Sequence, residues 1–199
     1  MKQRYFFTIS FIPKHADCGL LAGRCISTMH GFTSRNKVKG GIAISFPKWS
    51  LESLGNGIAF ISEEKELLIG LSFQPYLTVM KSEGLFEISD VTDVPDSLPE
   101  VRFVRNQTIG KSFLGSKKRR IKRSLVRAEI SGADHIPVAE ESRVLDHFHR
   151  VPISSDSSGQ DFILHVQKVA VENRDEPFFN SYGLATNQEK RGTVPDIPL

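Results

Sequence analysis

In the first half of the chain, the spacing of apolar residues switches between that of a β-strand and that of an α-helix. They alternate over residues 4–12, as in a half-buried strand, and take helical spacing from Asp17, a suitable N-cap, to Gly31. The remaining predicted elements are strands at 42–46 and 58–62, a helix at 62–82 that bends at Pro75, and a strand at 85–91. The order β-α-β-β-α-β predicts a ferredoxin-like (RRM-like) domain over residues 1–94.

A second, smaller α/β domain is expected over residues 100–199. Pro95 and Pro99, with acidic neighbours, indicate a linker before it. Its predicted elements are a basic helix at about 116–129, a helix at 138–149, strands at 151–154 and 162–166, and a loosely ordered end from residue 187. The sequence therefore predicts an α+β protein of two domains.

Charge is distributed very unevenly along the chain. Ten Lys and Arg residues, and no Asp or Glu, fall between Val101 and Arg127. The rest of the chain carries 16 basic and 23 acidic residues, so it sums to −7 while the whole chain is +3. Such a segment is typical of a surface that binds a polyanion.

Much of the basic segment has the pattern of one amphipathic helix. At about 100° per residue, an apolar face of Ile121, Leu125 and Ala128 lies opposite an arginine face, and we expect the apolar face to pack on a core. The arginine face consists of Arg119, Arg120, Arg123 and Arg127. A merely solvated helix usually pairs Glu with Lys four residues apart, and acids are missing here. Nucleic-acid binding is the favoured interpretation.

Several other classes of protein fit the sequence poorly. No apolar run approaches the roughly 20 residues that span a bilayer, so we expect a cytoplasmic protein with no membrane partner. Cys18 and Cys25 are expected to be reduced thiols, and no phosphate-binding loop or zinc motif is present. His147 and His149 could bind a metal, but an H-x-H on a helix more often places one imidazole in water and the other against the core. We expect no metal and no cofactor.

Two local patterns contain side chains that could take part in catalysis or in phosphate binding. His30 stands at the predicted end of the first helix, where the helix dipole favours an imidazolium; it could act as an acid or base, or only as a C-cap side chain. The hydroxyl-rich segment 154–162, which includes Ser155 and Ser157, could hold phosphate oxygens or form only a polar turn.

In combination, these patterns resemble the CRISPR-associated repeat-RNA endoribonucleases of the type I-F (Csy) class. The resemblance runs over nearly the whole length. The shared pieces, in family order, are His30 followed by I-x-I-S-F-P, Arg105-Asn106-Gln107 before the arginine-rich helix, S-x-S-S-G-Q-x-F at 155–162, and Tyr182-Gly183-Leu184.

The resemblance implies a role for each matching residue. His30 is expected to take the proton of the 2′-hydroxyl, Ser155 to position the attacking nucleotide, and Tyr182 to orient the histidine, with Ser157 as a supporting hydroxyl. The implied RNA-binding residues are Arg105 and Gln107 at base edges, Phe162 beside the last base pair, and Lys117, Arg119, Arg120, Arg123 and Arg127 on a helix in the RNA major groove.

The implied activity is metal-independent cleavage of precursor crRNA at the base of the repeat stem–loop. RNA carries its own nucleophile, so a base and a fixed conformation suffice to give a 2′,3′-cyclic phosphate and a 5′-hydroxyl. The implied partners are the repeat RNA and other subunits of a crRNA-guided complex, in a defence setting or, with a transposition adaptor, in a transposon-associated one. Two alternatives stay open: a non-catalytic hairpin-binding subunit, and a basic module that binds ribosomes or duplex DNA.

Overall fold

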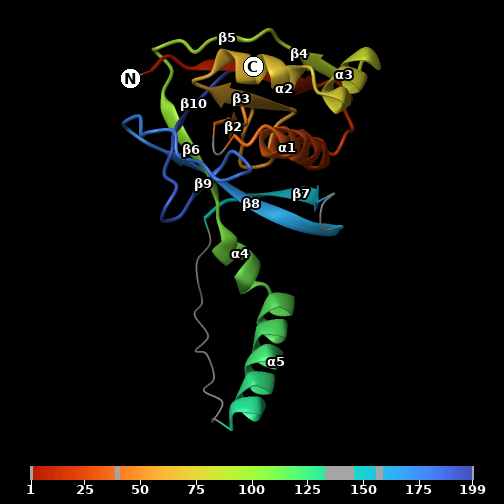
Figure 1. The fold of residues 1–199 in the computed structure, drawn as a ribbon, viewed down its shortest axis with the longest axis vertical. Coiled ribbons are helices and arrows are strands. Elements are labelled where there is room, and N and C mark those ends of the chain that lie inside the picture. The colour runs from red at the N-terminus through yellow and green to blue at the C-terminus, as the bar shows by residue number, and fades with distance from the viewer. Residues whose placement is uncertain (1, 39–40, 133–145, 156–158, 199) are drawn as a thin grey trace.

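The computed structural model describes residues 2–38, 41–132, 146–155 and 159–198. The first half forms an antiparallel sheet in the order β2-β3-β1-β4, and a short fifth strand, β5, also pairs with β1 (Figure 1). Its strands are β1 (Tyr5–Phe11), β2 (Ala43–Ser45), β3 (Gly57–Ser62), β4 (Phe86–Ile88) and β5 (Thr92–Asp93). Its helices are α1 (Cys18–Arg35), α2 (Lys65–Ser72) and α3 (Pro75–Ser82).

The second half forms another sheet, in the order β10-β6-β8-β7, with β9 parallel to β6. Its strands are β6 (Glu100–Arg105), β7 (His149–Ser155), β8 (Gln160–Ala170), β9 (Ala185–Thr186) and β10 (Val194–Pro195). Between β6 and β7 the chain forms α4 (Gln107–Ser112) and α5 (Leu114–Ser131). The predicted α+β class is confirmed. No helix of the described residues is long and apolar enough to cross a membrane.

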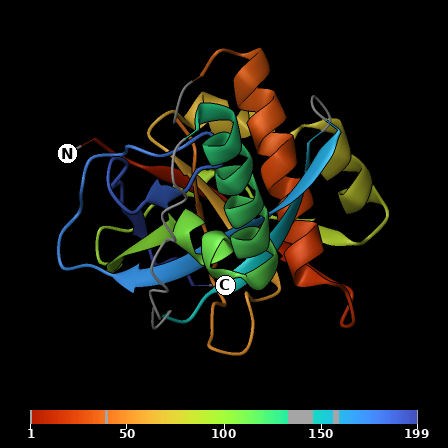
Figure 2. The same ribbon diagram turned by 90° about the horizontal axis from the view of Figure 1, so that it is seen from below.

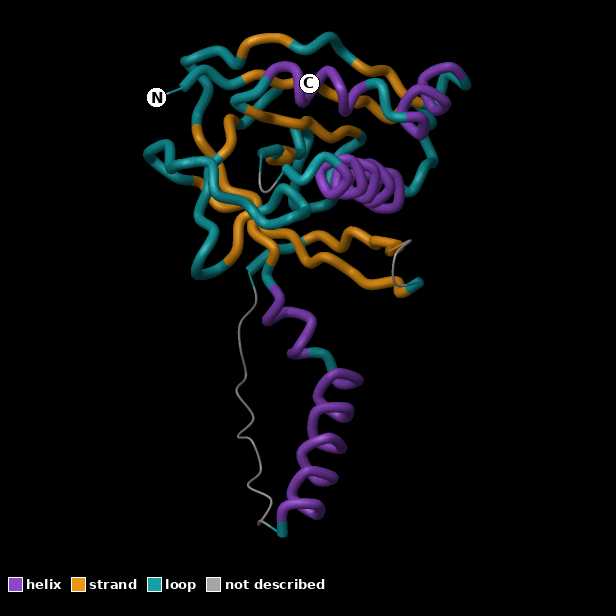
Figure 3. Tube along the Cα trace, viewed as in Figure 1, coloured by secondary structure: helices purple, strands orange, loops and turns teal. Residues whose placement is uncertain are grey.

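Helix α1 lies between the two sheets, whereas α4 and α5 lie on the side of β7 and β8 that faces away from α1 (Figures 1 and 2). The tube in Figure 3 shows the same layers and the distance to which α5 extends beyond them. One hydrophobic core runs through both halves, and it includes Phe7 from β1, Ile26 from α1 and Val151 from β7. An ion pair of Arg4 and Glu100, each side chain only 10% exposed, joins the two halves at the start of β6.

A glycine lets α1 approach β7 closely. A Cβ added at Gly23 would lie 1.9 Å from the backbone oxygen of Pro152, a distance that no real contact allows. This close approach fixes the distance between α1 and the end of β7, where Ser27 Oγ donates a hydrogen bond to the Ser154 carbonyl at 3.4 Å. The packing thereby brings β7 to within one helical turn of His30.

Gly23→Ala is expected to lower the free energy of unfolding by about 1–3 kcal/mol, because the methyl group forces α1 away from β7. Gly31→Ala is the matched control in the same helix. Its added Cβ meets nothing within 4 Å, so we expect a gain of up to about 1 kcal/mol from helix propensity. Urea denaturation of the two variants measures both values; equal effects would contradict the packing argument.

Two predicted helix boundaries are wrong. The helix predicted at 62–82 is two helices, because Pro75 occupies the first position of α3, with Gln74 as its N-cap in extended conformation. Helix α1 does not end at Gly31 but continues to Arg35, since Phe32 and Thr33 are buried and Thr33 Oγ1 bonds the Met29 carbonyl at 3.0 Å.

The end of the chain is ordered where the sequence predicts loose structure. Val194 and Pro195 form β10 on β6, and Ile197 is buried in the core. The helix predicted at 138–149 falls mostly outside the described residues, but residues 146–148 are not helical and His149 begins β7.

Candidate functional site

Four of the predicted site residues come together from four elements. The His30 ring, on α1, lies 4.7 Å from the Tyr182 ring, which follows β8 in the chain. The Phe162 ring, on β8, lies 5.7 Å from Tyr182. The guanidinium of Arg105, at the end of β6, lies 5.3 Å from the Tyr182 ring and 5.7 Å from the Phe162 ring. These four residues are called the His30 cluster below.

A backbone carbonyl determines which nitrogen of His30 carries the proton. His30 Nδ1 lies 3.0 Å from the carbonyl oxygen of Ser181. Because a carbonyl oxygen only accepts hydrogen bonds, Nδ1 must be the donor, and in the neutral imidazole Nε2 keeps its lone pair. The half-buried ring can therefore accept a proton at Nε2 without losing the bond that orients it. Such an orienting bond is typical of catalytic and metal-ligating histidines.

The turn that carries Ser181 and Tyr182 is fixed by its own backbone. Asn180 Oδ1 accepts hydrogen bonds from the backbone N–H of Tyr182 at 2.8 Å and of Leu184 at 3.3 Å. Gly183 has φ +71°, and its carbonyl accepts from the N–H of Ile44 in the first sheet at 3.0 Å. A Cβ at Gly183 would lie 3.0 Å from the Ile42 carbonyl, so both the conformation and the space favour glycine.

Arg105 is the half-buried arginine of the His30 cluster. Burial lowers the pKa of its guanidinium, and the adjacent Tyr182 opposes that shift. Contact with two aromatic rings restricts the orientation of the guanidinium and its N–H groups, which suits bidentate contacts with phosphate or with a guanine edge. Its side chain is preorganised for an anionic or base ligand.

The segment after Arg105 turns sharply into α4. Asn106 caps this helix by accepting from the Thr108 N–H at 3.0 Å, and its amide donates to Gln167 Oε1 on β8 at 2.8 Å. Gln107, a predicted base reader, is the first residue of α4 and is exposed. Asn106 therefore connects the end of β6 to both α4 and β8, and no role is predicted for it from the sequence.

His165 anchors α4 to the second sheet. Its side chain is 8% exposed, and its ring lies 5.5 Å from the rings of Phe113 and Phe148. Burial, and secondarily the positive charge of Arg150, lowers the pKa of this imidazole below 6.5. His165 is therefore neutral in the folded protein near pH 7.

The stability of the protein is expected to fall as the pH is lowered below about 6.5. The unfolded chain, in which His165 has an ordinary pKa, binds the proton first, so protons favour the unfolded state until the pH passes the lower folded pKa. We expect His165→Gln to flatten the free energy of unfolding between about pH 7.5 and 5.5, measured by urea denaturation. The exposed His15→Gln is the control; an unchanged slope in His165→Gln would contradict the assignment.

Helix α5 presents its arginines to solvent but does not pack as predicted. Arg119, Arg120, Arg123 and Arg127 are all exposed. Ile121 and Leu125, expected on a core, are 50% and 48% exposed, because α5 extends beyond both sheets (Figure 1). Arg119 and Arg123 each bond the carbonyl four residues earlier through Nε, which directs the guanidinium along the helix.

The hydroxyl-rich segment is described only in part. Ser155 is the last residue of β7 and pairs with Gln160, so the hairpin tip follows it, but its side chain lies outside what the structure describes. Ser157 lies outside the described residues altogether, and so does the side chain of Lys117, whose backbone belongs to α5.

The two histidines of the H-x-H pattern lie next to Trp49 and do not belong to the His30 cluster. His149 Nε2 is 2.8 Å from the Ser50 carbonyl and 3.2 Å from His147 Nε2, and the His149 ring lies 4.4 Å from that of Trp49. Within residues 2–38, 41–132, 146–155 and 159–198, no group of three or more His, Cys, Asp or Glu side chains could hold a metal ion.

Taken together, the fold and site define an α+β protein with an oriented histidine, an arginine packed against two aromatic rings and a cationic helix. The model of the family described as CRISPR-associated protein (Cas_Csy4) matches residues 6–197. The chain belongs to this family, and the predicted resemblance to the type I-F (Csy) class is confirmed. No curated protein matches the chain.

Proposed function

We propose that this protein is a metal-independent endoribonuclease that binds the CRISPR repeat stem–loop and cuts precursor crRNA at the base of the hairpin. The observation that carries the proposal is the bond from His30 Nδ1 to the Ser181 carbonyl, which leaves Nε2 as a proton acceptor. Its neighbours Tyr182, Phe162 and Arg105 offer rings and a cation for a nucleotide. Family membership gives the repeat RNA as substrate class.

The reaction needs only groups that this chain, the RNA and water supply. His30 Nε2 takes the proton of the 2′-hydroxyl, and the 2′ oxygen attacks the adjacent phosphorus. The bond from phosphorus to the 5′ oxygen breaks, that oxygen takes a proton from water, and His30 Nε2 returns the proton it accepted to the hydroxide so formed, so the products are a 2′,3′-cyclic phosphate and a 5′-hydroxyl. General base catalysis contributes about 10²–10⁴-fold, and fixing the in-line geometry contributes further.

The other predicted residues hold the RNA in this proposal. Arg105 and Gln107 read base edges at the foot of the stem, Phe162 packs beside the last base pair, and Tyr182 orients His30. Ser155 and Ser157 hold the attacking nucleotide and its phosphate. The arginines of α5, with Lys117, enter the RNA major groove, whose end widens near the base of a stem.

The strand order β2-β3-β1-β4 supports a ferredoxin-like arrangement for residues 1–94, with residues 100–199 as the RNA-binding part. In this proposal the chain also keeps the cut hairpin bound as a subunit of a crRNA-guided complex, in a defence or a transposition setting, and is located in the cytoplasm.

One experiment tests the proposal. The protein is incubated in EDTA with its repeat RNA and, in parallel, with the same RNA carrying one 2′-deoxy nucleotide at the cut site. Cleavage of the first RNA alone, with a cyclic phosphate end by mass spectrometry, is the expected result. Binding of both RNAs without cleavage would support the non-catalytic hairpin-binding subunit, and a requirement for metal would refute the mechanism.

A further inference from the structure

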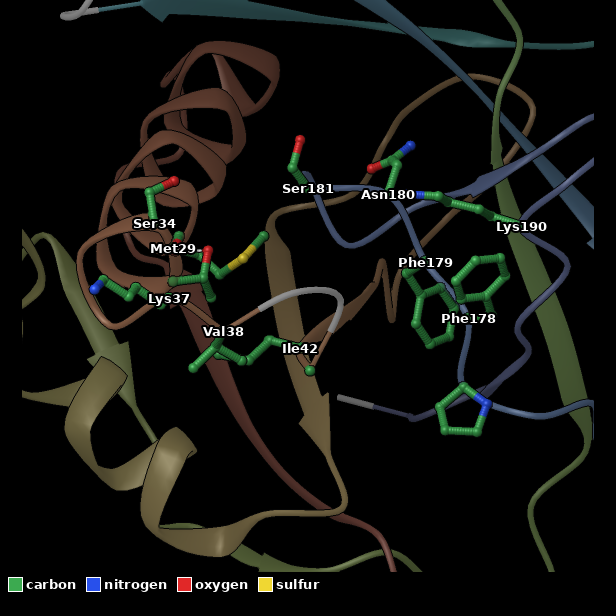
Figure 4. A pocket seen from close by; sticks show the side chains of 13 residues that line it. Met29, Ser34, Lys37, Val38, Ile42, Phe178, Phe179, Asn180, Ser181 and Lys190 are labelled. Carbon is green, nitrogen blue, oxygen red and sulfur yellow. Dashed lines mark hydrogen bonds between the residues drawn. The ribbon is translucent and has the colours of Figure 1, made fainter.

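A cavity of about 700 Å³ opens beside the C-terminal half of α1, the part of the helix that carries His30. One wall is the end of α1, and the opposite wall is the segment before the Tyr182 turn (Figure 4). Met29 and Ser181 line it, and these are the chain neighbour of His30 and the residue whose carbonyl accepts from His30 Nδ1. The cavity therefore adjoins the orienting bond of the proposed base.

The face of α1 that carries His30 continues along the cavity. Ser34 follows His30 by four residues and so lies on the same side of the helix, and Lys37 follows the C-cap residue Asn36 and lines the cavity as well. His30 consequently adjoins two sets of possible ligand contacts: its own cluster with Arg105, Phe162 and Tyr182, and the cavity that Ser34 and Lys37 line. An RNA strand bound at Arg105 could therefore pass His30 and enter this cavity.

The opposite wall offers an aromatic ring and a second cation. The Phe178 ring is 56% exposed, and Lys190 Nζ lies 5.4 Å from its centroid. The Phe178 backbone is held by the Gly192 N–H, which donates to its carbonyl at 3.1 Å. Figure 4 shows Lys37 and Lys190 on opposite sides of the cavity.

The charge and polarity of the cavity fit one ligand class. Its described lining includes two lysines and no Asp or Glu, while its floor is apolar, with Met29, Ile42 and Phe179 buried. An aromatic ring beside an apolar floor suits an unpaired base, and lysines at the rim suit phosphates. A volume of this order is typical of small-ligand sites, and it accommodates one or two nucleotides.

We infer that this cavity binds the single-stranded RNA immediately 3′ of the cut, the strand that leaves with the 5′-hydroxyl. The inference rests on the proposed function, since it takes the hairpin to lie on the Arg105 side of His30. A base stacks on Phe178, and Lys37 and Lys190 contact the phosphates beyond the scissile one. The contacts are to ring faces and backbone, so the site accepts any flanking sequence.

The test compares two RNAs, both 2′-deoxy at the cut site: a hairpin that ends at the cut, and the same hairpin with four more 3′ nucleotides. We expect the longer RNA to bind the unmodified protein more tightly by about 5- to 100-fold in fluorescence anisotropy. Phe178→Ala, Phe178→Leu and the pair Lys37→Gln with Lys190→Gln are each expected to remove most of this advantage, with affinity for the shorter hairpin unchanged within about twofold.

Phe73→Ala and Lys81→Gln are the matched controls, because both side chains are exposed elsewhere on the molecule, and they are expected to keep the full advantage. A 4-thiouridine as the first flanking nucleotide is expected to cross-link to residues 177–181 or 34–38. Equal affinity of the unmodified protein for the two RNAs, or a cross-link elsewhere, would overturn the inference while leaving the proposed function intact. Failure to bind the shorter hairpin would instead overturn the proposed function, and this inference with it.

Discussion

His30→Ala is expected to lower the rate constant of RNA cleavage by at least about 10²–10⁴-fold. Alanine removes the only proposed proton acceptor, Nε2, and the ring that bonds the Ser181 carbonyl. The affinity for the repeat hairpin is expected to stay within about threefold, because the proposed RNA contacts come mainly from Arg105 and α5. Single-turnover cleavage assays and anisotropy titrations measure the two quantities separately.

The outcome separates a catalytic histidine from a structural one. His15→Ala is the control, since His15 is exposed near the other end of α1 and should retain full cleavage. Parallel loss of hairpin affinity and cleavage in His30→Ala would show that the ring only supports the Tyr182 turn. Unchanged cleavage would exclude His30 as the base.

Neutralising α5 is expected to produce the largest loss of RNA affinity. In the triple variant Arg119→Gln, Arg123→Gln, Arg127→Gln, three exposed cations spaced four residues apart are lost from one face. If each makes one charge-assisted phosphate contact, the affinity falls on the order of 10³-fold. The slope of log K against log salt concentration also becomes shallower by about three.

A matched triple variant separates the effect of where the positive charges lie from the effect of how many are removed. Lys14→Gln, Lys48→Gln, Lys81→Gln removes the same three charges from exposed sites in the first half of the chain. We expect little change in its salt slope. Similar losses in the two triple variants would mean that RNA responds to net charge alone, and that α5 has no specific role.

Strand β1 could be predicted because it buries one face, so buried apolar residues alternate with less buried ones along it. Phe7, Ile9 and Phe11 of β1 are at most 2% exposed, and their period-two pattern is visible in the sequence. The end of α1 could not be predicted in the same way. Gly31 is a common helix terminator, but here the burial of Phe32 prolongs the helix, and tertiary packing overrides the local signal.

Contacts between segments far apart in the sequence explain the other wrong predictions. Strand β10 has two residues and forms only because β6 offers its edge, where Pro195 sits opposite Glu100. A proline is accepted at such an edge strand although it usually marks irregular structure. The exposed face of α5 shows the converse: an amphipathic pattern predicts a helix, but not that a core lies beside it.

In the candidate site, too, some groups could be predicted from the sequence and others could not. Side chains such as His30, Tyr182 and Arg105 were identified from their resemblance to family motifs, and the structure brings them together. The groups that hold them are backbone atoms and caps: the Ser181 carbonyl, the Gly183 turn and the Asn106 amide. A carbonyl acceptor is available at every residue, so no sequence pattern distinguishes the one that orients a histidine.

The most direct test of the account is the position of the His30 ring in a complex with the hairpin RNA. A crystal structure with RNA that is 2′-deoxy at the cut site gives the distance from Nε2 to the place of the missing 2′ oxygen. We expect about 2.6–3.2 Å, or a single bridging water. A ring that lies farther away, or that turns Nε2 from the ribose, would contradict the assignment of His30 as the base.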